Sequence, residues 1–241
     1  MKTTTSKDQV RNTAKAAVSR VLMTVALTVF LSTLTTPASA ASNSNPRVHP
    51  PQSNPYGKSY GEWAGIFWQW LLSFPGDASP AFEQGEVVYG TQKQSGPVWI
   101  LESGNVGVWE RHVRVPTGKG LLFSITGAAC DTLSLPGLNE QELRDCVNAP
   151  FNDLTIFASA EVDGVPIKNV ERYLITSPLF DINVPANGLF GIPSGAGQAI
   201  EKGWFFILAP LSKGQHTIRV RAHIVEAPEF DGDTTYHVTV E

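Results

Sequence analysis

Short strand-like segments, separated by turn residues, follow one another along most of this chain. They are rich in aliphatic, β-branched and aromatic residues, and Gly, Pro, Asn or Asp stands between them. The segments read GPVWILES, VWERHVRV, GLLFSIT, LTIFASAEV, VPIKNV, RYLITS, FDINV, GWFFILA, HTIRVRAHIV and TTYHVTV. Strands that alternate with turns rather than with helices predict a mainly β fold, here an antiparallel β-sandwich or jelly-roll-like domain. The 21 Gly and 17 Pro residues fit this expectation, because both residue types are frequent in turns.

The first 40 residues are expected to be a signal peptide. Basic side chains precede the apolar stretch VLMTVALTVFLSTLTT, and PASA follows it, with Ala38 and Ala40 at the small-residue positions of a cleavage site. Cleavage after Ala40 predicts a secreted or periplasmic protein without a transmembrane segment. Residues 41–56 are rich in Ser, Asn and Pro and predict a disordered tether, which leaves residues 57–241 as a single domain.

The charge of the processed chain argues against two classes of partner. The formal net charge is −4 at pH 7, and residues 1–40 contribute +4, so the chain from Ala41 onward carries −8. An acidic chain lacks the basic surface to which nucleic acids and anionic lipids bind. We therefore expect no nucleic-acid partner, and the oligomeric state stays open.

Half of the six Trp residues lie close together in the stretch GEWAGIFWQWLLSFP. At about 100° per residue, a helix here places Trp63, Phe67 and Trp70 on one broad apolar face. We therefore expect a core helix that packs on the sheet. Trp68 and Leu72 fall on the flank of that face. The alternative to a wholly structural helix is that they stay partly exposed and offer a stacking surface for sugar rings.

A second short helix and the two cysteines are expected to be linked. The stretch LNEQELRDCV predicts a helix that Asn139 could cap and that carries Cys146. Cys130 lies at the end of the GLLFSIT strand. In an exported protein a pair of cysteines most simply forms a disulfide, and two free buried thiols are the alternative.

The last two strand segments are expected to form a hairpin with a charged outer face. Alternation places Arg219, Arg221 and His223 on one face of the first strand, and His237 on the corresponding face of the second. Arginine side chains bind carboxylates and sulfates well, so this face predicts an acidic polysaccharide as ligand. An ordinary solvated sheet face is the alternative. The candidate ligand-binding residues are therefore Trp68 and these four.

No common catalytic motif is present. The sequence lacks GxSxG, HExxH, the phosphate-binding loop GxxxxGK[ST], GxGxxG before a helix, and the EF-hand pattern. The weaker candidates for acid–base chemistry are Glu110, His112, Asp131 and Asp181, which would have to meet in a cleft.

A calcium site is the one cofactor that the sequence suggests. Asp231 and Asp233 belong to the acidic loop EAPEFDGDTT, and carboxylates next to a Gly can hold Ca²⁺. Asp231-Gly232 is also a turn signal, and we take the turn as the primary interpretation and expect no cofactor.

Several stretches together resemble a group of exported bacterial β-rich proteins to which no activity is assigned. These stretches are YGEWAGIFWQWLLSFP, QSGPVWIL, VPTGKGLLFSI, RYLITSPLFDINVP and GWFFILAPLSKGQHTIRV. The resemblance implies a common β-rich fold and a cysteine pair like Cys130 and Cys146, and it implies no catalytic residue. We expect non-catalytic binding of a polar polymer such as carbohydrate, with a secreted polysaccharide hydrolase or lyase as the alternative.

Overall fold

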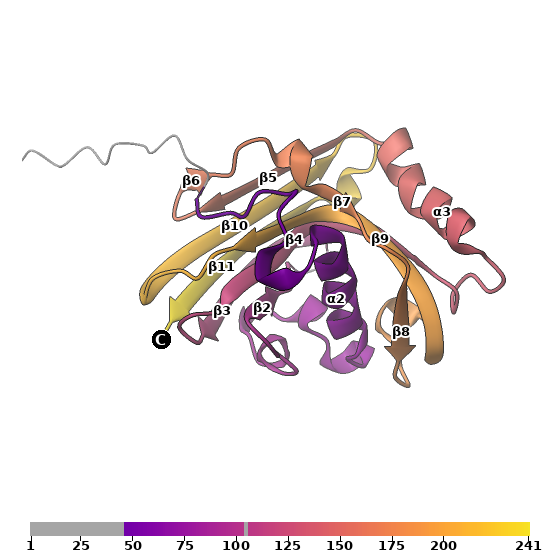
Figure 1. Cartoon of the computed structure of the whole chain (residues 1–241), viewed down its shortest axis with the longest axis horizontal. Helices are drawn as coiled ribbons and strands as arrows, with labels where there is room; N and C mark the ends of the chain where they lie inside the picture. The colour runs from indigo at the N-terminus through magenta and orange to yellow at the C-terminus, as the bar shows by residue number, and fades with distance from the viewer. Residues whose placement is uncertain (1–45, 104–105) are drawn as a thin grey trace, which may run out of the picture. The chain divides into compact units, whose positions relative to one another are not determined.

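The computed structural model describes residues 46–103 and 106–241 (Figure 1). The expected signal peptide, residues 1–40, lies outside the described residues. The fold is mainly β, as the sequence predicts, and consists of two sheets, two α-helices and several single-turn 3₁₀ helices.

The larger sheet has six strands, and two of its pairings are parallel. Its spatial order is β1(Gly85–Glu86), β3(Gly107–Val115), β11(Gly232–Val240), β10(Gly214–Ile224), β5(Ile156–Val162) and β6(Val165–Pro166). Strand β3 runs parallel to both β1 and β11, and the other pairs are antiparallel. The expected terminal hairpin β10–β11 is confirmed. A second hairpin joins β5 to β6 at Asp163-Gly164, where both residues have the positive φ that a tight turn requires.

The smaller sheet has five strands. Four of them lie side by side, and the fifth pairs with a free stretch of one of these four. Its order is β2(Val98–Leu101), β4(Gly120–Asp131), β9(Gly195–Leu208) and β7(Leu174–Thr176), and β8(Phe180–Val184) pairs with another part of β9. Strand β2 is parallel to β4. Both sheets are therefore mixed. The mainly β prediction is confirmed, and the finer expectation of an antiparallel sandwich or jelly-roll-like domain is not.

Strands β3 and β4 follow each other along the chain but do not pair. Between them, at PTGK, the chain passes from one sheet to the other instead of forming a hairpin. Strand β3 then takes β11, from the end of the chain, as its neighbour. Only local turn signals are visible in a sequence, and they do not report which distant strand becomes the partner.

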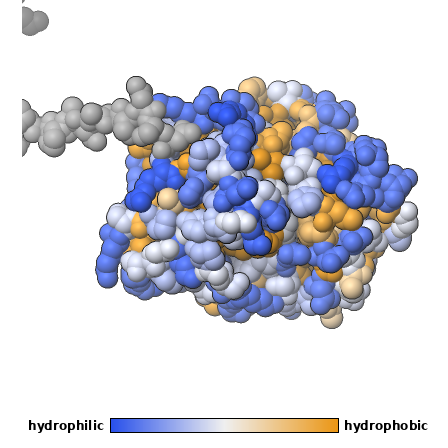
Figure 2. All heavy atoms as spheres, viewed as in Figure 1, coloured by the Kyte–Doolittle hydropathy of each residue, from blue (hydrophilic) through white to orange (hydrophobic). Residues whose placement is uncertain are grey.

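One hydrophobic core contains residues from both sheets and from α2. In the smaller sheet, residues 121–123 and 205–208 are buried without interruption, which means that both faces of β4 and β9 are covered there. From Ile218 onward in β10, and from Thr234 onward in β11, buried residues alternate with partly or fully exposed ones, so one face of the larger sheet meets the core and the other meets solvent. On the face drawn in Figure 2, apolar residues form separate patches between polar ones.

The Trp-rich stretch forms helix α2(Tyr60–Leu72), as expected. Ser59 caps it in a capping box with Glu62. In Figure 1, β9 arches over α2, and the helix packs on β7, β8 and β9. Gly65 lies against the ring of Phe180, where a Cβ would come within 3.1 Å of a ring carbon, so β8 also covers this side of the helix.

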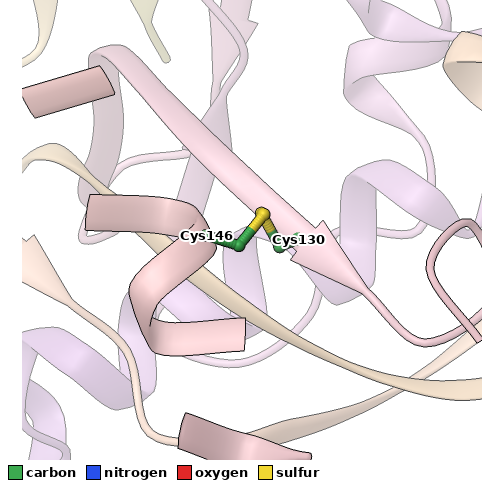
Figure 3. Close-up of a disulfide and its surroundings, with 2 residues drawn as sticks. All are labelled: Cys130 and Cys146. Carbon is green, nitrogen blue, oxygen red and sulfur yellow. A yellow bond between two sulfur atoms is a disulfide. The ribbon is translucent and has the colours of Figure 1, made fainter. Parts of the chain in front are cut away.

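The second helix, α3(Glu140–Asp153), is six residues longer at its C-terminal end than the predicted segment. Asn139 caps it, as expected, in a second capping box. A disulfide joins Cys146 on this helix to Cys130 at the end of β4, with a Cα–Cα distance of 6.3 Å (Figure 3). The predicted disulfide is thus confirmed, and it fastens α3 to the smaller sheet.

The described part of the expected tether is in contact with the domain. Val48 forms an antiparallel bridge with Leu208, and the Tyr60 hydroxyl donates to the backbone oxygen of His49. Tyr56 packs against the core. Composition alone suggested disorder, but backbone hydrogen bonds from His49 to Ile207 and from Ala209 to Arg47 join this segment to the end of β9.

Single-turn 3₁₀ helices join the larger elements. They are η1(Pro55–Gly57), η2(Gly76–Ala78), η3(Pro80–Phe82), η4(Tyr89–Thr91), η5(Val170–Tyr173), η6(Leu189–Gly191) and η7(Pro228–Phe230). Within residues 46–103 and 106–241, neither α-helix has the length and apolar character needed to cross a bilayer.

Candidate functional site

A pocket opens where β2 ends and β4 continues. Leu101, the last residue of β2, pairs with Phe123, whereas β4 runs on to Asp131. Beyond Phe123, this side of β4 has no paired strand among the described residues. A cavity of about 210 Å³ lies at this uncovered edge, between α2 and the ends of β10 and β11.

Four kinds of side chain line this cavity, which we call the acid pocket. It has the carboxyl groups of two glutamates, small hydroxyl side chains, an indole, and apolar groups from α2 and η6. The carboxyl groups are those of Glu102 and Glu201, the hydroxyls include those of Ser103 and Ser124, and the indole is that of Trp68. Phe190 is the apolar residue from η6.

A β-bulge in β4 shapes the wall of the acid pocket. The register between β4 and β9 shifts between Ser124 and Gly127, so that the intervening residues have no direct partner. Beyond the bulge, Gly127 lies opposite Gly203 on β9. A bulge bends its strand and increases its twist, and here it occurs next to the cavity.

The two glycines make room for the side chain of Glu201. A Cβ at Gly127 would overlap Oε1 of Glu201, and a Cβ at Gly203 would lie 2.9 Å from the same atom. Glu201 is itself only 1% exposed. Its carboxyl group is therefore held between two backbone segments that carry no side chain, a placement that no larger residue at either position permits.

Burial determines the protonation of Glu201. It raises the pKa of this carboxyl group well above its ordinary value. The nearby Trp68 N–H opposes this in part, and the negative charge of Glu102 raises the pKa further. The buried site thus favours the neutral acid, which can donate a proton in a hydrogen bond as well as accept one.

Polar atoms of Trp68 and Glu201 lie near each other at the pocket wall. Nε1 of Trp68 and Oε2 of Glu201 are both buried, and the indole N–H is close enough to the carboxyl group to lower its pKa. The indole N–H is therefore the donor that partly offsets the burial of the Glu201 carboxyl group.

A buried arginine fixes the backbone beside Glu102. Arg111 is 0% exposed, and its Nη1 donates to the backbone oxygens of Glu102 and Pro80 and to the hydroxyl of Tyr236. Its Nη2 donates to the backbone oxygen of Ala81. This guanidinium therefore connects β3, β11 and η3 at one side of the acid pocket and holds Glu102, 7% exposed, in place.

Of the predicted ligand-binding residues, Trp68 lies at the acid pocket and the other four lie elsewhere. Arg219, Arg221, His223 and His237 share the outer face of the larger sheet, on the strands that we expected to pair. The structure thus brings these four together on one surface, as alternation predicts, and separates them from Trp68.

Each of these four residues has a carboxylate partner. Arg219 binds both oxygens of Asp233 at 2.8 and 2.6 Å, and His223 lies 2.7 Å from Asp231. The remaining pairs are Arg221 with Glu161 at 3.8 Å and His237 with Glu110 at 2.8 Å. An anionic ligand would have to compete with these carboxylates, which makes the face less suitable for an acidic polymer than its basic residues alone indicate.

The candidates for acid–base chemistry do not meet in one cleft. Glu110 and His112 lie on the outer face, where the His112 ring stacks on that of His237 with 4.7 Å between centroids. Asp131 accepts from the backbone N–H groups of Leu133 and Ser134 and so caps a turn. Asp181 lies on β8 and accepts a hydrogen bond from Gln198.

The acidic loop is engaged by protein groups. Asp231 accepts from the backbone N–H of Ile224 and pairs with His223, while Asp233 pairs with Arg219. Over residues 46–103 and 106–241, no group of three or more His, Cys, Asp or Glu side chains is arranged to hold a metal ion. Neither the expectation of no cofactor nor the calcium alternative at Asp231 and Asp233 is tested by this observation.

Comparisons with known proteins add little. No family model matches the chain, and no curated protein matches it. One similar solved structure is "Structure of PbICP-C in complex with falcipain-2", with 11% identity, a TM-score of 0.26 and coverage of 59% of this chain and 98% of that one. Another is "Solution Structure of Amebosin", with 16% identity, a TM-score of 0.23 and coverage of 61% and 100%. Similarity at this level carries no functional argument.

The sequence did contain signals for the two residues that we missed. Glu102 follows the buried run VWIL directly, and Glu201 belongs to a strand that begins at Gly195, well before the predicted GWFFILA segment. Gly127 and Gly203 each lie inside a strand, and such glycines often mark a bulge or a close approach of another group. Read as a pair, they would have pointed to the carboxyl group between them.

Proposed function

We propose that this protein is an exported carbohydrate-binding protein that takes one sugar unit into the acid pocket. The observation that carries this proposal is the position of Trp68. Its indole forms a wall of a cavity whose other walls contain the carboxyl groups of Glu102 and Glu201. An aromatic face next to hydrogen-bonding groups suits a sugar ring, which has a C–H-rich face and a rim of hydroxyls.

The polar groups of the pocket wall support a hydroxyl-rich ligand. A sugar hydroxyl both donates and accepts, so it can bond to carboxyl groups and to hydroxyl side chains alike. The hydroxyl oxygens of Ser103 and Ser124, which lie 3.5 Å apart, offer further partners. A purely anionic ligand fits less well, because it would face two carboxyl groups.

The volume limits how much of a polymer can enter. A cavity of about 210 Å³ is smaller than the roughly 300–1,000 Å³ of sites for drug-sized ligands. It suits a single ring, such as the end of a chain or a side branch, rather than several consecutive rings. This supports recognition of a terminal unit.

Two features support export. The expected signal peptide at residues 1–40 directs secretion, and the Cys130–Cys146 disulfide fits an oxidising compartment. Both are consistent with a ligand outside the cytoplasm.

Binding of the exported protein to a glycan array, followed by calorimetry with the best ligand, tests the proposal. We expect Trp68→Ala to weaken binding at least tenfold, because stacking and an N–H donor are lost. Trp99→Ala is the matched control, since its Nε1 is buried like that of Trp68 while its side chain lies outside the acid pocket. Equal binding to every glycan, or an unchanged affinity of Trp68→Ala, would overturn the proposal.

The carboxyl pair favours a second candidate, hydrolysis of a glycosidic bond. In this reaction Glu201 gives its proton to the glycosidic oxygen as the C–O bond breaks. Glu102 accepts a proton from the water that attacks the anomeric carbon, and water is thereby added across the bond. A chromogenic glycoside panel tests this candidate. Activity that Glu201→Gln abolishes while sugar binding is retained would support it, and an inert panel would exclude these substrates.

A further inference from the structure

A second pocket lies on the other side of Trp68. Its volume is about 420 Å³, and its walls are mostly apolar. They include Leu72, Ala129, Phe180, Ile192 and both cysteines of the disulfide. Asp131 also reaches it, but this carboxylate already accepts two backbone hydrogen bonds. We call this cavity the apolar pocket.

The two pockets adjoin each other. Trp68 and Phe190 contribute to the walls of both the acid pocket and the apolar pocket. Trp68 presents its polar N–H near Glu201, while its ring also borders the apolar side. A ligand longer than one sugar ring can therefore pass along these two side chains from polar surroundings to apolar ones.

Phe190 is held in an unusual conformation at this junction. Its φ is 57°, in the left-handed region that a bulky residue rarely adopts. The side chain is 52% exposed and packs edge-on against Phe82, which is 47% exposed, with 6.0 Å between ring centroids. A strained backbone that displays half-exposed phenyl rings contributes little to a core, and such strain is concentrated at sites that hold ligands.

We propose that the two pockets together bind one amphipathic ligand, a glycoside with an apolar aglycone such as a glycolipid. Its sugar lies in the acid pocket, and its alkyl or aryl part lies past Trp68 and Phe190 in the apolar pocket. The sugar half of this inference rests on the proposed function, whereas the apolar half rests on the second pocket. The disulfide forms part of the wall for the apolar group.

This arrangement predicts which part of the ligand provides affinity. The acid pocket replaces water around hydroxyls with protein partners, an exchange that contributes little net affinity. Each methylene group that leaves water contributes far more, so two buried methylenes already give about a tenfold gain. Recognition of the sugar in the acid pocket provides the specificity, and burial of the aglycone in the apolar pocket provides most of the affinity.

Calorimetry with matched glycosides tests the inference on the exported protein. The probes are methyl and n-octyl glycosides of glucose, galactose and mannose, with the octyl compounds kept below their micelle concentrations. We expect the octyl glycoside of at least one sugar to bind ten times more tightly than its methyl counterpart. An octyl chain on an oligoethylene glycol head group is expected to bind at least ten times more weakly than that octyl glycoside.

A substitution in the apolar pocket alone separates its contribution from that of the acid pocket. Ala129 is exposed on β4, so Ala129→Trp fills the apolar pocket without disturbing the core, and we expect it to remove the octyl gain while methyl-glycoside binding persists. Ala196→Trp is the matched control, an exposed alanine on β9 outside this pocket, and it should keep the gain. Phe190→Ala, which removes the shared wall, should also reduce the gain.

The outcomes distinguish the two proposals. Binding of methyl and octyl glycosides with equal affinity overturns this inference and leaves carbohydrate binding intact. Equal binding of the octyl glycosides and the octyl oligoethylene glycol overturns the sugar site and leaves only an apolar pocket. Binding of none of these probes contradicts both.

Discussion

The acid pocket and the outer face of the larger sheet place polar side chains in opposite surroundings. At the acid pocket, the carboxyl group of Glu201 is buried beside the Trp68 N–H, and burial raises its pKa. On the outer face, Arg219 and His223 lie near solvent, and each is paired with a carboxylate. The contrast teaches that a face rich in charges offers less to a ligand than its composition suggests when those charges are already paired.

The largest expected effect concerns the two arginines of β3 that lie on opposite faces. Arg111→Met should lower the free energy of unfolding by about 3 to 5 kcal/mol, because it leaves several buried carbonyl oxygens without their donor. Arg114→Met is the matched control. Its side chain is 65% exposed and pairs with Glu241 on the surface, so we expect a change below about 1 kcal/mol. Urea denaturation measures both, and equal effects would remove the contrast between the two faces.

A second test measures whether the requirement for a glycine at position 127 depends on the side chain of Glu201. Gly127→Ala should destabilise the protein by about 1 to 3 kcal/mol, because its Cβ overlaps Oε1 of the glutamate. In a Glu201→Ala background the same substitution should cost less, since that oxygen is gone and only the backbone of β9 remains close. A double-mutant cycle by urea denaturation measures this coupling. Strictly additive effects on the free energy of unfolding would show that Gly127 is required by the backbone of the strand and not by Glu201.

Much of the fold could be predicted from local signals, as the helices illustrate. Ser59 and Asn139 cap α2 and α3, and the alternation in HTIRVRAHIV placed Arg219 and His223 on the solvent side of β10. Each of these features depends on residues close in sequence. The disulfide could also be anticipated, because the chain has only two cysteines.

The pairing of β3 and the acid pocket could not be predicted in the same way. Nothing near β3 specifies that β11, more than a hundred residues later, becomes its parallel neighbour. Likewise, Glu102 and Glu201 come together only because β2, β4 and β9 share a sheet. The first half of β9, GAGQAIEK, has little apolar periodicity, so its strand character depends on pairing with β8 and β4.

The two regions should also respond to pH in opposite directions. Burial raises the pKa of Glu201 above 4.5, so its neutral form stabilises the fold fully below that pH, and this contribution is lost as the pH rises through the raised folded value. The hydrogen bond from Arg219 lowers the pKa of Asp233 below 3.8, so its contribution exists above that value and is lost in acid.

Denaturation curves at several pH values measure these slopes. Between pH 5 and pH 8, wild type should lose stability relative to Glu201→Gln, at a rate of at most about 1.4 kcal/mol per pH unit. Below pH 4, wild type should lose stability relative to Asp233→Asn. Parallel curves for wild type and Glu201→Gln would mean that the acid pocket is open to water and that its glutamate ionises freely.

The smallest effect is expected at Arg219, despite its two short hydrogen bonds to Asp233. Its side chain is 38% exposed, and exposed ion pairs contribute about 0 to 1 kcal/mol because water and salt screen them. Arg219→Ala should therefore lower the free energy of unfolding by less than about 1 kcal/mol, and 1 M NaCl should remove most of that difference. Arg221→Ala, whose nearest carboxylate oxygen is 3.8 Å away, is the control and should change less. A large, salt-independent loss of stability in Arg219→Ala would mean that this ion pair stabilises the fold as strongly as the buried contacts do. The paired charges of the outer face would then need to be reconsidered as a site.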